Sequence, residues 1–375
     1  MSDQRHGLEL RSTILAEGSL TLSLEDVTVA APGPDEIVVR IEAAPINPSD
    51  LGLLLGPADL ATLRTGGTSE RPTLIFDVSE RRLATVAARV GQSMPVGNEG
   101  AGTVVEAGEN VAHLLGKKVG MIGGGMYTQV RKIAARDALV LPDGASSADG
   151  ASMFVNPLTA LSFVETMRME GHKAIVHTAA ASNLGQMLNR ICLADDVPLV
   201  NIVRGEAQVA LLKAAGATWV IDSSTPDFEA ALTDAIAATG ATLGFDAIGG
   251  GKLAGQILTA MENAANRNPG EYSRYGSTTF KQVYIYGALD LGPTSLNRTF
   301  GFSWSLSGWL LFPFLQKAGA EVAARLRKRV VDELKTTFAS HYTATIGLAE
   351  ALKPDILMAY QRKATGEKYL INPTR

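Results

Sequence analysis

Short apolar runs alternate with amphipathic runs through the second half of the chain. Five apolar runs have the length and composition of buried β-strands, and they span residues 173–179, 198–203, 219–222, 243–248 and 283–288. A helix is predicted from residue 183 because its apolar side chains share one face: Leu184, Met187, Leu188 and Ile191. Two further helices are predicted over about 206–215 and 227–238, each followed by a glycine. This alternation predicts an α/β fold with a parallel, doubly wound sheet.

The first 150 residues follow a different pattern. Residues 20–30 and 36–43 are strand-like, 97–108 is rich in Gly and Val, and 118–130 contains three consecutive glycines. Together these segments predict an irregular β domain. Residues 64–91 are more charged and helix-prone, so we expect them to form an insertion within that domain.

The C-terminal third contains one apolar stretch that is long enough to raise the question of a membrane span. Residues 299–316 carry no charge, which places them at the lower length limit for a transmembrane helix. Three serines, Gly308 and Pro313 interrupt the stretch, so a buried or interface helix is the better prediction. Beyond it, a helix is predicted over 349–363 and a short strand over 368–371.

Composition limits the class of protein. The chain has 375 residues, 46% of them hydrophobic and 19% charged, which predicts two to three folded domains in a soluble protein. The formal net charge of -4, with no basic block, argues against binding to nucleic acid. A single cysteine, Cys192, excludes an internal disulfide and a thiolate zinc cluster. With no apolar signal segment after Met1, a cytoplasmic location is expected.

A candidate phosphate-binding turn follows the first predicted strand of the parallel sheet. Ala180, Ser182 and Gly185 occupy the three spacings of G-x-G-x-x-G between a strand and a helix. Small residues are needed there because the backbone must turn sharply and approach a pyrophosphate at the helix N-terminus. Since two of the glycines are replaced, the residues alone leave nucleotide binding and an ordinary strand-to-helix turn equally open.

The end of the second strand distinguishes between cofactors. An acidic residue that binds a ribose 2′-hydroxyl is expected there, but the chain has Val203 and Arg204. A guanidinium fits a 2′-phosphate, so NADP(H) is favoured over NAD(H). The alternative is a solvated loop arginine, with Glu206 nearby as an opposing charge. Glycine-rich loops also follow later strands, at 246–251 and 286–288.

Several motifs, in the same order along the chain, resemble one family. They are Asn47-Pro48-Ser49-Asp50 (similar to N-P-S-D), residues 95–105 (P-x-x-G-x-E-G-A-G-x-V), 156–160 (NPLTA), 211–217 (L-L-K-x-L-G-A), 245–250 (D-x-V-G-G) and 366–373 (G-K-x-V-L-x-P). Together they resemble the medium-chain dehydrogenase/reductase superfamily, in its zinc-free quinone oxidoreductase (zeta-crystallin-like) branch.

The resemblance implies two domains and an NADPH site. A GroES-like β domain would comprise 1–155 and 339–375, and a Rossmann domain 156–338. The cofactor-binding residues implied by the turn and the resemblance are Asn156, Thr159, Ala180, Ser182, Asn183, Leu184, Gly185, Arg204, Gln208, Ile248, Gly249, Tyr286, Gly287 and Lys368. The aromatic residues of the 299–316 stretch are expected to form a subunit interface or pocket wall, and a homodimer is expected.

Two residues are candidates for chemistry. Asn47, by its family position, would orient the nicotinamide or a substrate oxygen; an Asx-type turn before Pro48 is an equal alternative. Tyr127 is a candidate proton donor. Zinc-dependent relatives carry a cysteine near the first motif and a histidine before the Glu of the second, where this chain has Asn47 and Asn98, so no metal is expected.

The resemblance therefore implies NADPH-dependent hydride transfer to a quinone or a related conjugated carbonyl compound. An enoyl-thioester reductase is the first alternative. Those enzymes carry a proton-donating tyrosine about eight residues after the Asp of N-P-S-D, where Ala58 stands here. A catalytically inactive NADPH-binding protein is the second alternative, because the glycine pattern of the turn is altered.

Overall fold

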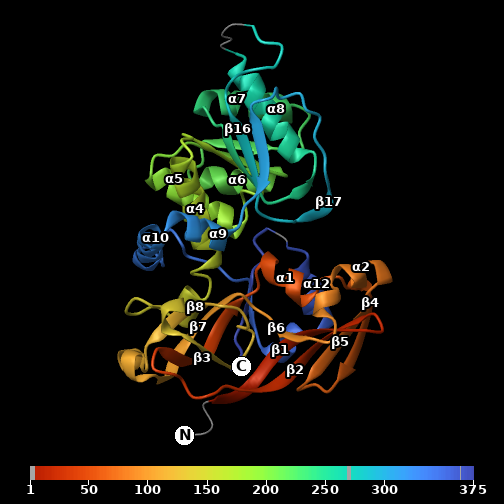
Figure 1. Ribbon diagram of the computed structural model, residues 1–375, viewed down its shortest axis with the longest axis vertical. Helices are drawn as coiled ribbons and strands as arrows, with labels where there is room; N and C mark the ends of the chain where they lie inside the picture. The colour runs from red at the N-terminus through yellow and green to blue at the C-terminus, as the bar shows by residue number, and fades with distance from the viewer. Residues whose placement is uncertain (1–4, 268–271, 364) are drawn as a thin grey trace. The chain divides into compact units, whose positions relative to one another are not determined.

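The computed structural model describes residues 5–267, 272–363 and 365–375, which form two compact units. Unit 1 comprises Met1–Val155 and Val330–Arg375, and unit 2 comprises Asn156–Arg329 (Figure 1). The sequence placed the second boundary after residue 338. The structure places it nine residues earlier, within helix α10 (Ala320–Asp332).

The first sheet of unit 1 is antiparallel. Its strand order is β4 (Asp59–Gly67), β5 (Pro72–Asp77), β2 (Ser19–Thr28), β1 (His6–Leu15) and β6 (Ser93–Pro95). The β4–β5 hairpin corrects the expectation of a helix-prone insertion. Leu74 and Phe76 alternate along β5 and are buried opposite Leu22 and Leu20 of β2, so period-2 burial decides the conformation. Only α2 (Glu80–Thr85) and a 3-10 turn (Ala87–Arg89) are helical in this segment.

The second sheet of unit 1 includes the C-terminal end of the chain. Its order is β10 (Ala138–Val140), β8 (Lys118–Ile122), β7 (Glu99–Ala107), β3 (Glu36–Pro45), β20 (Tyr369–Ile371) and β19 (Ala344–Ile346), and β9 (Val130–Ala134) also pairs with β3. The predicted helix over 349–363 is two helices, α11 (Leu348–Ala351) and α12 (Pro354–Gln361). Pro354 separates them because proline is accepted in the first turn of a helix but not in its interior.

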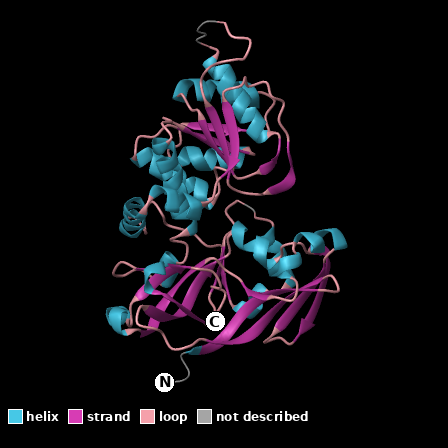
Figure 2. Ribbon diagram, viewed as in Figure 1, coloured by secondary structure: helices cyan, strands magenta, loops and turns pink. Residues whose placement is uncertain are grey.

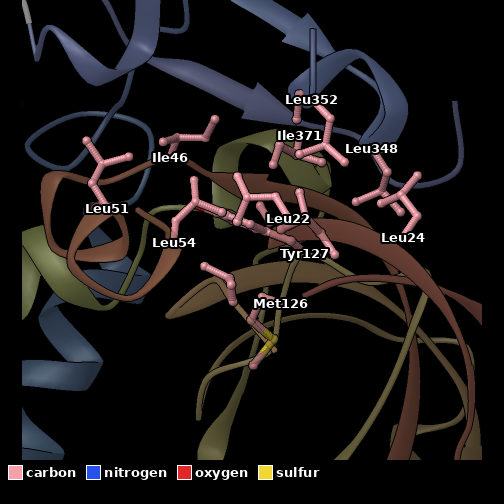
Figure 3. Close-up of a cluster of buried hydrophobic side chains, with 14 of the residues drawn as sticks. Leu22, Leu24, Ile46, Leu51, Leu54, Met126, Tyr127, Leu348, Leu352 and Ile371 are labelled. Carbon is pink, nitrogen blue, oxygen red and sulfur yellow. The ribbon is translucent and has the colours of Figure 1, made fainter. Parts of the chain in front are cut away.

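A shared apolar core joins these sheets to the short helix α1 (Pro48–Leu54) (Figure 3). Leu51 and Leu54 of α1, Tyr127, and Ile371 of β20 all belong to it and are buried. Smaller elements complete unit 1: α3 (Ser147–Gly150) and 3-10 turns at Glu109–Leu114 and Ala135–Asp137. This core fixes the N-terminus of α1 relative to the C-terminal strand.

Unit 2 contains the predicted parallel sheet, and the α/β fold class is confirmed (Figure 2). The order is β13 (Trp219–Asp222), β12 (Leu199–Val203), β11 (Ile175–His177), β14 (Leu243–Asp246), β16 (Lys281–Ile285) and β18 (Trp304–Gly308), all parallel. Strand order reverses beside β11, which is where doubly wound sheets bind nucleotides. A small pair, β15 (Gly249–Gly251) and β17 (Asp290–Thr294), lies outside it.

Helices cover both faces of this sheet. On one face, α7 (Phe228–Thr239) and α8 (Leu253–Ala265) enclose a core with Val176 and Val200. On the other, Phe163 of α4 (Val155–Met169) stacks on Phe245 with ring centroids 3.8 Å apart. The other helices of this unit are α5 (Asn183–Ala194), α6 (Glu206–Ala214) and α9 (Leu311–Ala318). The helices predicted from the periodicity are thus observed within one or two residues.

The apolar stretch 299–316 is not one helix. It forms β18 and the start of α9, because Gly308 and the residues after it end the strand before the helix begins. Phe302, Leu310 and Phe312 are exposed. Among the described residues, no helix is long and apolar enough to cross a membrane.

A buried ion pair fixes the loop before β16. Lys281 Nζ lies 2.6 Å from Glu262 Oε2 on α8, and both side chains are almost fully buried. Burial acts to raise the pKa of Glu262, but hydrogen bonds from Lys281 and Ser277 outweigh it and hold the pKa at about 2. The loop is therefore anchored to the Rossmann core by charge.

Candidate cofactor and substrate sites

The turn after β11 has the backbone geometry that a phosphate-binding turn requires. Ser182 caps α5, and its Oγ accepts a hydrogen bond from the Gly185 N–H at 3.1 Å. A Cβ on Gly185 would lie 2.1 Å from the carbonyl oxygen of Ala180, so only glycine fits there. Ala179 adopts a positive φ of 50°. The altered motif therefore keeps Gly185, the glycine that the close packing of α5 on the turn requires. The N-terminus of α5, with its free N–H groups, is directed at the turn.

The structure places the other predicted turn residues around this helix end. Asn156 Nδ2 donates to Asn183 Oδ1 at 2.8 Å, which joins the start of α4 to the start of α5. Thr159, Ala180 and Leu184 are buried. These three side chains pack behind the turn, so their part in any cofactor site is to shape its backbone.

A pocket of about 460 Å³ lies where β12 and β13 end. It is lined by Arg204, Gln208, Ser223 and Ser224. Gln208 Oε1 accepts a hydrogen bond from the Arg204 N–H at 2.8 Å, which fixes the loop between β12 and α6. The Arg204 guanidinium is the charged donor of this pocket and suits a phosphate monoester, whereas Ser223 Oγ donates to the Val203 carbonyl at 2.9 Å.

The two serines of this pocket were not predicted from the sequence. They directly follow β13, the strand that pairs with β12. Because parallel neighbours end at the same edge of a sheet, the residues after β13 could have been expected near Arg204, which follows β12. Asp222 adds negative charge at the rim, where its Oδ1 accepts from Ser224 Oγ at 2.7 Å.

Asp246 organises the loop after β14. Its buried carboxylate accepts hydrogen bonds from Thr178 Oγ1 at 2.8 Å, from the Ile248 N–H at 2.9 Å and from the Gly249 N–H at 3.2 Å. The predicted residues Ile248 and Gly249 are therefore tied to the turn after β11. Gly287 belongs to the same packing, because a Cβ there would lie 2.6 Å from the Ala247 carbonyl oxygen.

Tyr286, at the end of β16, is paired with a buried histidine. Its hydroxyl lies 2.8 Å from His177 Nε2, and the two rings stack. Burial lowers the pKa of His177 to about 3, so the imidazole stays neutral at physiological pH. Burial also raises the pKa of Tyr286, so its hydroxyl stays protonated. The pair is a neutral hydrogen-bonded unit that fixes the orientation of the tyrosine ring.

In unit 1, Asn47 lies at the N-terminus of α1 and bonds across to β7. Its Nδ2 donates to Glu99 Oε1 at 2.8 Å, while its backbone N–H donates to Asp50 Oδ2 at 2.8 Å. Its Oδ1 is buried and accepts no hydrogen bond from the described residues. The side chain does not cap its own helix, so the Asx-type turn considered from the sequence is not what orients it.

Tyr127 and Asp50 form the interior of this cluster. Tyr127 Oη lies 3.0 Å from Asp50 Oδ2 and 3.1 Å from the Pro45 carbonyl oxygen, so the two acceptors share its single proton, and the ring is fully buried. The Asn98 N–H donates to Asp50 Oδ1 at 2.9 Å. Burial raises the pKa of Asp50 to about 7 despite these three donors. Tyr127, with its hydroxyl engaged on both sides, supports Asp50 from within the core.

Glu99 and Lys368 complete the cluster. Glu99 is fully buried, and its Oε2 accepts from the Phe154 and Val155 N–H groups, each at 2.9 Å. Burial raises the pKa of Glu99. Burial also lowers the pKa of the half-buried Lys368 to about 8, against the opposing effect of the Glu99 and Asp50 charges.

Comparisons with known proteins identify similar sequences and similar structures. No protein-family model matches the chain. A mitochondrial enoyl-[acyl-carrier-protein] reductase from Xenopus tropicalis is 30% identical over 197 residues, which cover 51% of this chain and 48% of the relative. The chain thus spans about half the length of the curated relatives it matches.

Solved structures match the whole chain. A protein assigned as an NADPH:quinone reductase from Mesorhizobium loti has a TM-score of 0.73 and 26% identity, covering 100% of both chains. This chain has the medium-chain dehydrogenase/reductase fold. The Etr1p complex with NADP and crotonyl-CoA has the same fold, with a TM-score of 0.67, 18% identity, and coverage of 98% of this chain and 99% of that chain. The resemblance seen in the motifs is confirmed, with quinone reductases and enoyl reductases both among the neighbours.

The resemblance implies that two amides of this chain stand where zinc-dependent relatives carry a cysteine and a histidine. Asn47 and Asn98 hold these positions, and both use N–H groups as donors inside the cluster. In the described part of the chain, no group of three His, Cys, Asp or Glu residues is placed to hold a metal ion. Cys192 is buried in α5, in the other unit.

Proposed function

We propose that the protein is an NADPH-dependent reductase of quinones or related conjugated carbonyl compounds, acting without a metal. The observation that carries this proposal is the presence in unit 2 of a turn that requires Gly185 and of a pocket of about 460 Å³ lined by Arg204. The full-length similarity to a quinone reductase at 26% identity supports the substrate class. The curated enoyl reductases support the oxidoreductase chemistry more broadly.

The residues of unit 2 fit NADPH. The backbone of 180–185 and the N-terminus of α5 would bind the pyrophosphate. Arg204 would bind the 2′-phosphate that distinguishes NADPH from NADH, in the pocket that Ser223 and Ser224 also line. When bound, NADPH supplies the hydride. Tyr286, held by His177, would form one wall of the nicotinamide site.

In unit 1, Asn47 is the candidate residue for orienting a ligand. Its Nδ2 is held by Glu99, so the group left for a ligand is the carbonyl Oδ1, which accepts a hydrogen bond from an amide or a hydroxyl. A reduced quinone gains its protons on oxygen, and water can supply them. Quinone reduction therefore needs orientation and a dry site more than it needs a protein acid.

An enoyl-thioester reductase is the second candidate, favoured by the relative at 30% identity. Its expected tyrosine is replaced by Ala58, which is buried just after α1. This substitution is the reason to place quinones and simple enones first.

An acceptor screen tests the proposal. The purified protein and NADPH are mixed with one acceptor at a time: 1,4-benzoquinone, a cyclic enone or crotonyl-CoA. The loss of NADPH absorbance is recorded for each acceptor. We expect the protein to reduce the quinone with NADPH. The rate with NADH in place of NADPH should be at least about tenfold lower. Faster reduction of the thioester would favour the second candidate, and NADPH binding without turnover of any acceptor would support an inactive binding protein.

A further inference from the structure

His177 and Asn201 lie side by side in the interior of the parallel sheet. They are register partners on the adjacent strands β11 and β12. Paired residues of neighbouring strands point their side chains to the same face of a sheet, and such strands lie about 4.8 Å apart. The ring centroids of His177 and Phe163 of α4 are 5.9 Å apart, so this is the face that α4 covers. Both side chains are fully buried.

Three polar atoms of these two side chains lack a protein partner. His177 Nδ1 and both Oδ1 and Nδ2 of Asn201 form no hydrogen bond with any residue in the described part of the chain. A buried amide or imidazole nitrogen without a hydrogen bond costs free energy, so such groups in folded proteins are nearly always paired, often with internal water. Polar side chains that are neighbours but do not bond directly therefore indicate a bridging water.

The Tyr286 hydroxyl determines which group His177 presents to Asn201. Its Oη lies 2.8 Å from His177 Nε2. A phenol O–H is a much stronger acid than the N–H of a neutral imidazole, so the O–H donates and Nε2 accepts. Because burial keeps the imidazole neutral, its single proton is then on Nδ1. This buried N–H needs an acceptor.

We propose that His177 and Asn201 bind at least one internal water molecule on the face of the sheet that α4 covers. The water accepts a hydrogen bond from the Nδ1–H of His177 and donates one to Oδ1 of Asn201. Its second lone pair, or a second water, accepts from Asn201 Nδ2. Since both residues are fully buried, the ligand must be as small as water. The site lies wholly within unit 2 and does not depend on the proposed function.

The water site fixes what Tyr286 offers to a ligand at the end of β16. With its proton directed to His177, the hydroxyl keeps only oxygen lone pairs, so it accepts hydrogen bonds and donates none. Under the proposed function, on which this consequence rests, Tyr286 would accept from the carboxamide N–H of the nicotinamide and would not protonate the substrate. Asn201 is then a positioning residue that acts on Tyr286 through the water and His177.

A crystal structure of the protein without added cofactor, at a resolution that shows ordered water, tests the site itself. We expect a water within about 3.2 Å of both His177 Nδ1 and an amide atom of Asn201. A direct hydrogen bond between the two side chains, or no water between them, would overturn the proposal.

NMR of the protein labelled with ¹⁵N-histidine, again without cofactor, tests the position of the proton. The chain has five histidines, so the signals of His177 are assigned by their loss from His177→Gln. A protonated ring nitrogen and a bare one have well-separated ¹⁵N shifts, and we expect Nδ1 to be protonated and Nε2 bare. The opposite tautomer would contradict the role given to Tyr286 and overturn the proposal.

Asn201→Leu tests the link between the amide and the imidazole. Leucine has a similar size but no polar atom, so the water loses a partner and the His177 shifts should move toward the form protonated on Nε2. The matched control is Asn189→Leu, a buried asparagine of α5 whose Nδ2 donates to the Ala215 carbonyl at 3.2 Å. This control should leave the His177 signals as in the wild type.

Unchanged His177 signals in Asn201→Leu would overturn the link. If Asn201→Leu does not fold, the crystal structure and the wild-type spectrum still decide the proposal. Both are recorded without cofactor, so they hold even if the protein fails to bind NADPH and the proposed function is wrong.

Discussion

Asn47 Nδ2 donates a 2.8 Å hydrogen bond to Glu99 Oε1, and this bond joins two sequence motifs that lie in different elements of unit 1. The first motif begins α1, and the second begins β7. Both side chains are buried away from water. The bond therefore gives the Asn47 amide a hydrogen-bond acceptor and the Glu99 Oε1 a donor.

Removing this bond should destabilise unit 1. In Asn47→Ala, Glu99 Oε1 loses its donor while remaining buried, and we expect the free energy of unfolding to fall by about 2 kcal/mol. Urea denaturation followed by circular dichroism measures this change. The matched control is Asn98→Ala, because that side chain donates only to Ser49 Oγ at the exposed edge of the cluster, at 3.0 Å. An equal effect of both variants would contradict a special role for the Asn47–Glu99 bond.

Asp50 should make stability depend on pH. Its pKa is raised to about 7 in the folded protein from an ordinary value of 3.8, so between these values the folded state binds more protons than the unfolded state. The stabilising contribution of the protonated carboxyl group is full below pH 3.8 and is lost as pH rises through 7.

Asp50→Asn removes this titration and isolates it from that of other groups. The variant should be less stable than the wild type, since an amide cannot accept from all three donors of Asp50. The stability deficit should be about 2 kcal/mol smaller at pH 8 than at pH 5. Denaturation curves at the two pH values measure it, and a deficit independent of pH would refute the raised pKa.

Gly185→Ala should damage the phosphate turn. The new methyl group would lie 2.1 Å from the Ala180 carbonyl oxygen, so α5 must move away from the turn. We expect the free energy of unfolding to fall by roughly 2 kcal/mol, and NADPH and NADH to lose affinity together. Gly205→Ala is the control, because nothing lies within 4 Å of a Cβ there and its φ of 169° is extended backbone. Undiminished binding in Gly185→Ala would argue against a nucleotide site at this turn.

Arg204→Ala should remove the preference for NADPH. Loss of a charge-assisted hydrogen bond to a phosphate weakens NADPH binding by roughly 10- to 100-fold, and NADH affinity should stay within about twofold. Isothermal titration calorimetry with each cofactor gives both values. The control is Arg267→Ala, an exposed arginine paired with Asp234 on α7. Equal losses for the two cofactors would contradict a 2′-phosphate site.

Periodicity in the sequence predicted the parallel sheet because buried parallel strands are continuous apolar runs and their helices are amphipathic. The same periodicity did not predict β4 and β5. These strands carry exposed charged residues such as Arg64 and Asp77 and few buried ones, a composition that is also typical of a surface helix. The register of β20 with β3 follows from chain topology, which is why the pairing of Leu370 with Pro45 could not be predicted from spacing.

The candidate site was predictable where backbone conformation restricts residue type. Ser182 caps α5, and Gly185 is required because a Cβ there would meet the Ala180 carbonyl oxygen. Both residues were recognised in the sequence by their spacing between a strand and a helix. Asp50 and Tyr127 meet only through tertiary packing, and Ser223 lines the pocket only because β13 pairs with β12. Their roles therefore became visible only in three dimensions.

Titration of the purified protein with NADPH and NADH, followed by the change in cofactor fluorescence, tests whether unit 2 holds an NADPH site. We expect saturable binding of NADPH that is at least about tenfold tighter than binding of NADH, and oxidation of the bound NADPH when 1,4-benzoquinone is added. Failure to bind either cofactor would mean that the altered turn is not a nucleotide site, and would contradict the assignment of this protein as a reductase.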